Sequence, residues 1–540
     1  MNAGEVLVVG GGSAAHRFAE RLHHHGHRGG LTVLGAEPRA PYHRVLLTSV
    51  LDGTLPAAAL ALPELPEGVR VRTGVTVTRI DRRRRLAYAD DGSVHRYDTL
   101  VLATGARPRV PRIPGLPRPG GAEGVLTLRT LADAEHVLRA APDARRTVVL
   151  GAGLLGVETA AALRRAGHEV ALVHRGPHPL HRHVDATAGA LLVRHLTDLG
   201  VELHTGRRAT GHCSGKLTLD DGSVLAADTL LLCTGAVPET ELARRTGLTV
   251  RSGITVDGRL RTDDPHIHAI GDCAEHPGDT AGHLEPAWAQ AESLARHLTG
   301  AGGGPEHHGT RQITRLRLPG LDLVRLGRDP ALSPDAARAA HAQAAGGAKA
   351  APGAEAAGGA HPSAGTDRAD GTALAAGTAL AGGADPAGGA DPAGGADPAD
   401  GTHPTGSGAE VVTFTDPTRG RYARLTLHDQ RITGAVLLGL PRAIAAVSRL
   451  YERGLPVPAG RLEFLLGIPP AAPGADELPD DAVVCRCNNV TKHAITEACR
   501  AGAADVEQVA AATRATTGCG GCTSAVRSLC GPVRTGSTPS

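Results

Sequence analysis

The sequence has no long apolar run and no marked excess of charge of either sign. Its 540 residues carry a net charge of +2, which is too balanced to indicate a nucleic-acid partner. No stretch reaches the roughly twenty apolar residues that a membrane helix needs. The first residues, 1–6, lack the basic segment that opens a secretory leader. We therefore expect a cytoplasmic protein of several domains, with no nucleic-acid or membrane partner.

Cysteine is scarce before residue 484 and clustered after it, where six of the nine cysteines lie. Four of the six form a C-x-C pair and a C-x-x-C pair separated by 31 residues, namely Cys485, Cys487, Cys519 and Cys522. Two close pairs joined by a helical hairpin can bring four thiolates to one point, where they hold a zinc ion or an iron–sulfur cluster. Cys499 and Cys530 are left out of this ligand set, because one lies inside an expected helix and the other near the tail.

A glycine-rich turn follows the apolar run at residues 6–9 and precedes an expected helix over residues 16–24. It reads G-x-G-x-x-A and comprises Gly10, Gly12, Ser13, Ala14 and Ala15. Gly10 permits a tight turn, Gly12 lets a pyrophosphate approach the backbone, and Ala15 lets the helix pack closely. Glu37, after a second expected strand at 31–34, is placed to accept hydrogen bonds from a ribose.

The chain repeats itself. Residues 90–106 recur as residues 220–236, and each copy runs from an Asp-Asp-Gly-Ser turn into a buried strand that ends in Thr-Gly. A second glycine-rich turn with Gly151, Gly153 and Gly156 precedes the second copy. The sequence therefore predicts two dinucleotide-binding modules.

Residues 1 to about 300 resemble the two-dinucleotide-binding flavoprotein superfamily. The resemblance implies that the first module holds FAD and the second a nicotinamide. It returns Gly271 and Asp272 to the first module, where the aspartate binds the ribitol hydroxyls of the flavin. The Thr-Gly strand ends are assigned accordingly, Thr104 and Gly105 to FAD and Gly235 to the nicotinamide.

The nicotinamide is not fixed by the sequence. The second strand of the second module ends in His174 and Arg175, with no carboxylate to repel a 2′-phosphate. Arg175 and a protonated His174 could pair with that phosphate. A solvated Arg175 explains the sequence as well, so NADH and NADPH both remain open.

The flavin has no redox disulfide beside it. Disulfide reductases of this fold carry a C-x4-C pair after the second strand, whereas residues 37–48 contain no cysteine. Cys213, Cys233 and Cys273 are isolated in sequence, and Cys233 lies in an apolar strand where a buried structural thiol is expected. Electrons must therefore leave the flavin by another route.

Three short segments resemble NAD(P)H nitrite reductase large subunits and their relatives. They are residues 41–47, with a Tyr-x-Arg motif, residues 128–133 and residues 285–291. The resemblance places Arg44, Thr48 and Arg129 near the flavin. Strand-like alternation at 311–328 and 411–438, and a helix at 441–454, resemble the domain that follows the flavoprotein core in these reductases. Between them, residues 331–408 are almost wholly Ala, Gly, Asp, Pro and Thr, which predicts disorder.

Residues 484–530 resemble the [2Fe–2S] domain named after bacterioferritin-associated ferredoxin. Helices are expected at 492–501, capped by Thr491, at 506–514 and from Thr523. Glycines beside Cys519 and Cys522 offer backbone N–H groups to the cluster sulfurs. Zinc is the alternative by ligand type alone.

The predicted architecture is α/β, with two Rossmann-like modules of the two-domain flavoprotein fold, an α+β domain with a disordered insert, and a small helical [2Fe–2S] domain. We expect an FAD module at 1–118 and 263–304, an NAD(P)H module at 119–262, the α+β domain at 305–330 and 409–470, the insert at 331–408, and the [2Fe–2S] domain at 480–532.

This order predicts an oxidoreductase that moves electrons from NAD(P)H through FAD to the [2Fe–2S] cluster, with no catalytic side chain assigned. Nitrite reductase large subunits need four further cysteines for sirohaem and a [4Fe–4S] cluster, and only 18 residues follow Cys522. The resemblance therefore implies the electron-transfer subunit of an assimilatory nitrate reductase, with a separate molybdenum-containing catalytic subunit. One alternative sends the electrons to a nitrite reductase or a ferredoxin-type carrier. Another makes the cysteines a structural zinc or partner-docking module on an NAD(P)H oxidase.

Overall fold

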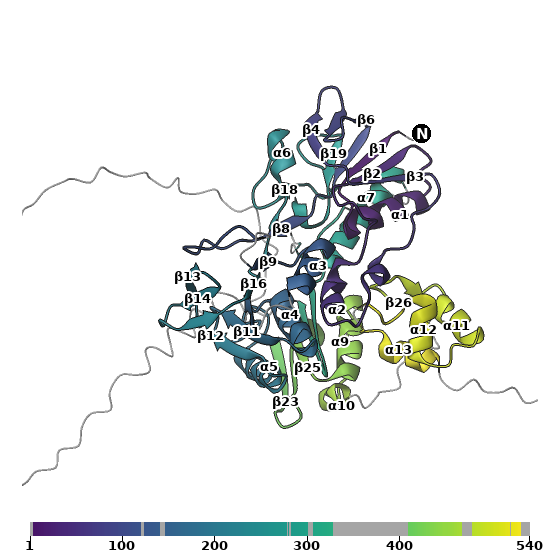
Figure 1. Ribbon diagram of the computed structural model, residues 1–540. Coiled ribbons are helices and arrows are strands. Elements are labelled where there is room, and N and C mark those ends of the chain that lie inside the picture. Colours follow the sequence, from purple (N-terminus) through teal and green to yellow (C-terminus); the bar gives the residue numbers. More distant parts are fainter. Residues whose placement is uncertain are drawn as a thin grey trace, which may run out of the picture. The chain divides into compact units, whose positions relative to one another are not determined.

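A computed structural model describes residues 4–119, 124–140, 146–277, 279, 282–300, 306–327, 409–466, 478–518 and 520–530 (Figure 1). These residues all belong to one compact unit, formed by Met1–Ala336 and Ala409–Ser540. The predicted insert at 331–408 and Cys519 lie outside the described residues. No helix in the described ranges is long and apolar enough to cross a membrane.

The first module is built on a five-stranded sheet in which all neighbouring strands are parallel. Its order is β19 (Ile267–Ala269), β7 (Thr99–Leu102), β1 (Val6–Val9), β2 (Leu31–Gly35) and β3 (Val69–Thr73). The central strands are almost wholly apolar and buried, as parallel strands covered on both faces must be. Helices α1 (Ser13–His24) and α7 (Leu284–Thr299) pack against each other beside this sheet (Figure 1). Because β19 joins β7, the chain returns to the first module immediately before Gly271, as the superfamily resemblance predicts.

The second module repeats this plan. Its parallel sheet has the order β12 (Glu202–Thr205), β11 (Glu169–His174), β10 (Arg146–Leu150), β16 (Thr229–Leu232) and β9 (Val125–Thr127). Its helices are α3 (Leu131–Ala140), α4 (Leu154–Arg165) and α5 (Ala186–Asp198). Asp185 caps α5, since its side chain accepts a hydrogen bond from the Ala188 N–H.

Each copy of the internal repeat contributes the last strand of a small antiparallel sheet, and the two sheets match. One contains β4 (Val77–Asp81), β5 (Leu86–Ala89) and β6 (Val94–Arg96), and the other β13 (Ala209–Cys213), β14 (Lys216–Leu219) and β15 (Val224–Ala226). The predicted turns are present, because Asp91 and Asp221 each accept a hydrogen bond from the backbone N–H two residues later. After the two Thr-Gly strand ends, β8 (Ala106–Pro108) and β17 (Ala236–Pro238) pair with each other and join the modules.

The remaining elements of the two modules are short. They are η1 (Arg44–Leu46), α2 (Leu47–Leu51), η2 (Ala57–Leu60), α6 (Glu241–Arg245), β18 (Ile254–Thr255), η3 (Gly271–Cys273) and β20 (Ala274–Glu275).

The third domain is α+β, as predicted. Its antiparallel sheet has the order β21 (Ile313–Leu318), β22 (Leu321–Gly327), β25 (Arg431–Leu438), β24 (Arg421–His428) and β23 (Ala409–Asp416). Helix α9 (Pro441–Arg453) packs against this sheet, and α10 (Arg461–Leu465) follows. Proline at the first position of α9 and Gly454 at its end, with a φ of 62°, set the boundaries of that helix.

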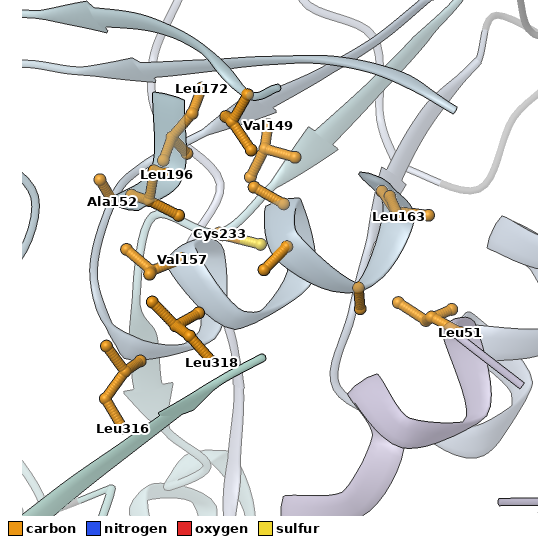
Figure 2. Close-up of a cluster of buried hydrophobic side chains, with 14 of the residues drawn as sticks. Leu51, Val149, Ala152, Val157, Leu163, Leu172, Leu196, Cys233, Leu316 and Leu318 are labelled. Carbon is orange, nitrogen blue, oxygen red and sulfur yellow. The ribbon is translucent and has the colours of Figure 1, made fainter. Parts of the chain in front are cut away.

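Strand β21 packs on helix α4 of the second module. Figure 2 shows Leu316 and Leu318 of β21 pointing toward Val157 of α4, with the Cys233 thiol among the same apolar side chains. Burial raises the pKa of Cys233 to about 12, so the thiol stays protonated. Cys233 is therefore a structural thiol, as the sequence predicted.

Glu158 of α4 lies at the same contact and gives the first testable prediction. Burial raises its pKa to about 7, against a weak hydrogen bond of 3.4 Å from the Arg317 N–H. Because the folded form binds its proton more tightly than the unfolded chain, stability falls as the pH rises from about 4.5 to 7. Because the Glu158 side chain is still partly exposed, the expected change in stability is smaller than the full pKa shift implies. We therefore expect Glu158→Gln to stabilise the protein by on the order of 2 kcal/mol at pH 8 and by nothing near pH 4. Thermal unfolding of the variant and the wild-type protein at pH 4 and pH 8 checks this prediction. An equal change in unfolding temperature at both pH values contradicts it.

The cysteine-rich domain contains a short antiparallel pair and three helices. They are β26 (Val483–Cys485), β27 (Val490–Thr491), α11 (Lys492–Arg500), α12 (Val506–Thr513) and α13 (Thr523–Leu529). The Thr491 side chain caps α11 by accepting a hydrogen bond from the Ala494 N–H, as predicted. Asp505 caps α12 in the same way.

Candidate functional site

The β1–α1 turn has room for a phosphate. Gly10 has a φ of 125°, and a Cβ there would lie 2.1 Å from the carbonyl oxygen of Ala103, so only glycine fits. Gly12 is different, because a Cβ there would meet no atom within 4 Å. Gly12 is also the N-cap residue of α1 and offers no side-chain cap to its first N–H groups. An uncapped helix start with open space beside Gly12 fits the pyrophosphate of FAD.

Glu37 and Arg44 form one hydrogen-bonded group beyond β2. Arg44 forms an ion pair with Glu37, and the Tyr42 hydroxyl donates to Glu37 Oε2 at 2.7 Å. Tyr42 is also bound by the Leu131 N–H at 2.9 Å, and burial raises its pKa, so it remains a donor. The sequence identified Glu37 and Arg44 but gave no role to Tyr42, the first residue of the Tyr-x-Arg motif. Thr48 follows in α2, and its assignment to FAD stays a prediction.

Asp272 and Arg129 meet at the same edge of the first module. Arg129 forms an ion pair with Asp272, and its carbonyl oxygen accepts a hydrogen bond from Arg44 Nη1 at 3.1 Å. Gly271 lies against the first turn of α1, since a Cβ there would be 2.9 Å from the Cβ of Ala14. The structure thus brings together predicted FAD positions from four separate parts of the sequence, at Ala14, Arg44, Arg129 and residues 271–272.

Three further residues lie near this edge, two of them predicted from the sequence. The Thr104 hydroxyl donates to the carbonyl oxygen of Glu239 at 2.6 Å, and Gly105 has a φ of 73° where the chain enters β8. Gln290 of α7, which the sequence did not single out, accepts a hydrogen bond from the Gly271 N–H at 2.7 Å. Its only sequence signal is its place in the matched segment 285–291.

The second module opens a cavity of about 870 Å³ at its own glycine-rich turn. The lining includes Gly151, Gly153, His174, Arg175 and Gly235, all predicted nicotinamide positions. Gly153 is again an uncapped helix start, here of α4, and a Cβ there would meet nothing within 4 Å. The same cavity reaches Arg129 and Asp272. The two predicted cofactor sites are therefore contiguous.

Gly156, the predicted third glycine of this turn, allows helix α4 to lie close to the turn. A Cβ at Gly156 would lie 1.8 Å from the carbonyl oxygen of Gly151, which excludes any larger residue. This is the role that the third glycine of such a turn has.

His174 is held as a neutral hydrogen-bonding residue. Its Nδ1 accepts a hydrogen bond from the Ala152 N–H at 3.2 Å, and its Nε2 lies 2.8 Å from Nδ1 of His181. Burial, with smaller contributions from the His181 ring and Arg175, lowers the pKa of His174 to about 4. A protonated His174 is thus not the group that would pair with a 2′-phosphate near pH 7. Several other cations that the sequence did not single out line the cavity, among them Arg182, Arg207 and Arg208.

Arg175 remains the predicted partner of a 2′-phosphate, and the prediction is testable. If it pairs with that group, Arg175→Ala will raise the KM for NADPH about tenfold or more and leave the KM for NADH nearly unchanged. Arg139→Ala, an exposed arginine on α3, is the control and will change neither value. Steady-state kinetics with both nucleotides checks it. If neither KM changes, Arg175 is a solvated side chain. If both KM values rise equally, Arg175 binds the part that the two nucleotides share.

The described cysteines of the C-terminal domain converge on one core. Cys485 and Cys522 are only 1% and 6% exposed, and Cys487 packs against the same cluster. Gly518 lies against the C-x-C loop, since a Cβ there would be 2.4 Å from the Cβ of Cys487. The Asn488 side chain joins the two loops by donating to the Arg514 carbonyl oxygen and to Thr517 Oγ1. This thiol-rich, closely apposed pair of loops fits a [2Fe–2S] cluster, with Cys519 remaining a predicted ligand.

Cys499 and Cys530 form a separate pair. Their Sγ atoms lie 3.1 Å apart, at α11 and at the end of α13. Burial raises the pKa of Cys530 to about 12, and the hydrogen bond from Cys499 adds to this. The two thiols partner each other, which agrees with their exclusion from the predicted ligand set.

The cysteine-rich domain contacts the FAD module through Arg514. Its Nη1 donates to the carbonyl oxygen of Ala61 at 2.6 Å. Ala61 forms a β-bridge with Tyr42, whose hydroxyl binds Glu37. Because Asn488 binds the Arg514 carbonyl, a continuous line of contacts joins the C-x-C loop to the predicted FAD site.

Comparison with protein families gives two matches. Residues 4–292 match the pyridine nucleotide-disulphide oxidoreductase model, and residues 483–530 match the BFD-like [2Fe-2S] binding domain. The chain is also similar to solved reductases. It matches the ferredoxin reductase of the CYP199A2 system of Rhodopseudomonas palustris with a TM-score of 0.63 at 23% identity, covering 84% of this chain and 95% of that one. At that identity the likeness shows the fold.

Several curated proteins are similar over most of the chain. The nitrite reductase [NAD(P)H] large subunit of Klebsiella oxytoca is 31% identical over 97% of this chain and 48% of its own length. The assimilatory nitrate reductase electron transfer subunit of Bacillus subtilis is 26% identical over 98% and 60%. Rhodocoxin reductase of Rhodococcus erythropolis is 36% identical over 55% of this chain and 72% of its own length. The chain thus spans about half the length of the nitrite and nitrate reductase relatives.

Proposed function

The chain belongs to the pyridine nucleotide-disulphide oxidoreductase family, and we propose that it is the electron-transfer component of an assimilatory nitrate reductase. It is an NAD(P)H-dependent flavoprotein oxidoreductase with a BFD-like [2Fe–2S] domain. Its cofactors are FAD, NAD(P)H and the [2Fe–2S] cluster. What we add is the destination of the electrons, which is a separate molybdenum-containing catalytic subunit.

The observation that supports electron flow from FAD to the cluster is the contact between the cysteine-rich domain and the FAD module. Arg514 holds the carbonyl oxygen of Ala61, and its own carbonyl oxygen is held by Asn488 beside Cys487. A second contact lies on the third domain, where Arg486 in the C-x-C motif forms an ion pair of 2.7 Å with Glu452 of α9. The candidate cluster is therefore held against the flavoprotein by side chains on both sides of its ligand loops.

The chain's own residues arrange the transfer. Gly12 and Gly153 open the two helix starts to phosphates, so both nucleotides bind with their charge at uncapped N–H groups. The cavity of the second module also reaches Arg129 and Asp272, so a nicotinamide bound in it would lie beside the predicted FAD site of the first module. When bound, the flavin accepts electrons in pairs and releases them singly, which is the chemistry that links a nicotinamide to an iron–sulfur cluster.

The choice of nitrate reductase rests on the relative named as an assimilatory nitrate reductase electron transfer subunit, which is similar along 98% of the chain. Relatives named as nitrite reductases are similar over the same span, so a nitrite reductase partner is the nearest alternative. A ferredoxin acceptor is the second alternative, since relatives named as ferredoxin reductases are similar over only 55–56% of this chain.

The experiment uses the purified full chain with FAD and cluster content measured. We expect NAD(P)H-dependent reduction of ferricyanide, no consumption of nitrate by the chain alone, and nitrate reduction when the molybdenum subunit is added. Parallel assays replace that subunit by a nitrite reductase or a ferredoxin at the same concentration. Nitrate turnover by the isolated chain, or faster transfer to either alternative acceptor, overturns the proposal.

A further inference from the structure

Three metal-ligating side chains meet beside the flavin edge, outside the groups assigned above. They are His276, Asp279 and His307, and their ligand atoms all lie within 4.8 Å of one another. Nε2 of His307 is 2.6 Å from Oδ2 of Asp279, and Nδ1 of His276 is 3.7 Å from the same oxygen. Ligands of a tetrahedral zinc ion lie roughly 3.3 Å apart, as follows from bonds of about 2.0–2.1 Å. The observed separations lie on either side of this value.

The cluster is buried and not fully paired. The side chains of His276, Asp279 and His307 are 6%, 6% and 5% exposed. Nδ1 of His276 is nevertheless a buried atom that has no hydrogen-bond partner among the residues that the structure describes. A buried unpaired nitrogen costs free energy unless something binds its lone pair or its proton. A metal ion between the three side chains supplies that partner.

The donor atoms of the cluster suit a divalent metal ion. Two imidazole nitrogens, from His276 and His307, and one carboxylate, from Asp279, form an N2O donor set of the kind that binds zinc and similar divalent transition metals.

The surrounding groups orient the ligands. Gln290 Nε2 donates to Oδ2 of Asp279 at 2.7 Å, and the Thr310 hydroxyl donates to Oδ1 at 3.1 Å. The backbone of His307 is fixed because its N–H donates to the carbonyl oxygen of Gly258 at 2.6 Å. Metal-binding carboxylates are characteristically held by such outer hydrogen bonds. A cavity of about 120 Å³ borders His276 and Asp279 and has room for a water as fourth ligand.

We propose that His276, Asp279 and His307 bind one divalent transition-metal ion, for which zinc is the best match, in the FAD module. The metal takes the place of the proton that joins His307 to Asp279. The metal site is linked to the predicted FAD position Gly271, because Gln290 binds both Asp279 and the Gly271 N–H. The site thus joins the segment after β20 to residues 306–310 and to α7.

The experiment uses the full chain loaded with FAD and [2Fe–2S], so that the cysteine site is occupied. After treatment with a chelator, zinc is returned in competition with a chromophoric chelator. We expect the wild-type protein to bind about one equivalent, and His276→Gln and His307→Gln to weaken binding at least tenfold. His308→Gln, at the exposed neighbouring histidine, is the matched control and will bind as the wild type does.

X-ray absorption at the zinc edge of the wild-type protein decides the outcome even if a variant fails to fold. Nitrogen and oxygen neighbours at about 2.0–2.1 Å support the proposal. Sulfur neighbours at about 2.3 Å would place the zinc at the cysteines and overturn it. No zinc uptake by the chelator-treated protein, or equal affinity in all four proteins, overturns it as well.

Discussion

Replacing Cys485 with serine will remove the [2Fe–2S] cluster and cut electron transfer to the protein acceptor, while the flavin still accepts electrons from NAD(P)H. Cys485 is 1% exposed at the end of β26, in the core that the cysteine-rich domain forms around its ligand loops. A serine hydroxyl loses its proton far less readily than a thiol, so it is a much weaker iron ligand than the thiolate that it replaces. We expect iron and acid-labile sulfide to fall from about two per chain to near zero. Transfer to the protein acceptor should fall by on the order of a hundredfold, as steady-state assays will show.

Cys499→Ser is the matched control, because Cys499 is a cysteine of the same domain that pairs with Cys530 instead of joining the ligand loops. We expect it to keep its iron, sulfide and electron paramagnetic resonance signal. Ferricyanide reduction by NAD(P)H should be retained in both variants. A cluster that survives Cys485→Ser, or one that is lost in Cys499→Ser, would contradict the assigned ligand set.

The glycine-rich turns were predictable because their requirements are local. A strand, three small residues and a helix within about ten residues determine the backbone path, and Gly10 and Gly151 have the positive φ values and close contacts that this path demands. The helix starts follow the same logic. Thr491 was predicted as a cap from its position before an apolar periodic run, and the structure confirms it.

The return of the chain to the first module could be predicted only from the family resemblance. Nothing within residues 267–272 indicates that β19 pairs with β7, some 165 residues earlier in the chain. The same holds for Gln290, whose contact with Gly271 follows from the packing of α7 against α1. Side chains that act through long-range contacts have no periodic or local signature, so the sequence alone left them unassigned.

The charge of His174 shows a different limit. Its position at the end of β11 was predicted, but its protonation depends on burial and on His181 and the Ala152 N–H. A sequence motif gives the kind of side chain and its place in a strand. The electrostatic state follows only from the groups that pack around it.

Gly12→Val and Gly153→Val will separate the two nucleotide sites. Both glycines have ordinary negative φ values as N-cap residues, and a Cβ at either meets no atom within 4 Å. The protein itself therefore tolerates the added side chain, whereas a phosphate at the helix start does not. We expect Gly12→Val to fold without FAD. We expect Gly153→Val to retain FAD but to lose on the order of a hundredfold in kcat/KM for NAD(P)H, which corresponds to about 2.7 kcal/mol.

The two variants control each other, and Gly10→Ala completes the comparison. At Gly10 the added Cβ would meet the Ala103 carbonyl oxygen at 2.1 Å in a backbone conformation with φ of 125°, so this smaller substitution should impair folding itself. Flavin absorbance, circular dichroism and NAD(P)H kinetics distinguish the three effects. If Gly153→Val loses FAD, or Gly12→Val keeps it, the glycines do not face the phosphates of separate cofactors. The larger side chain should thus be tolerated where the smaller one is not, because open space at Gly12 and Gly153 is reserved for ligands, whereas the space at Gly10 is filled by the protein.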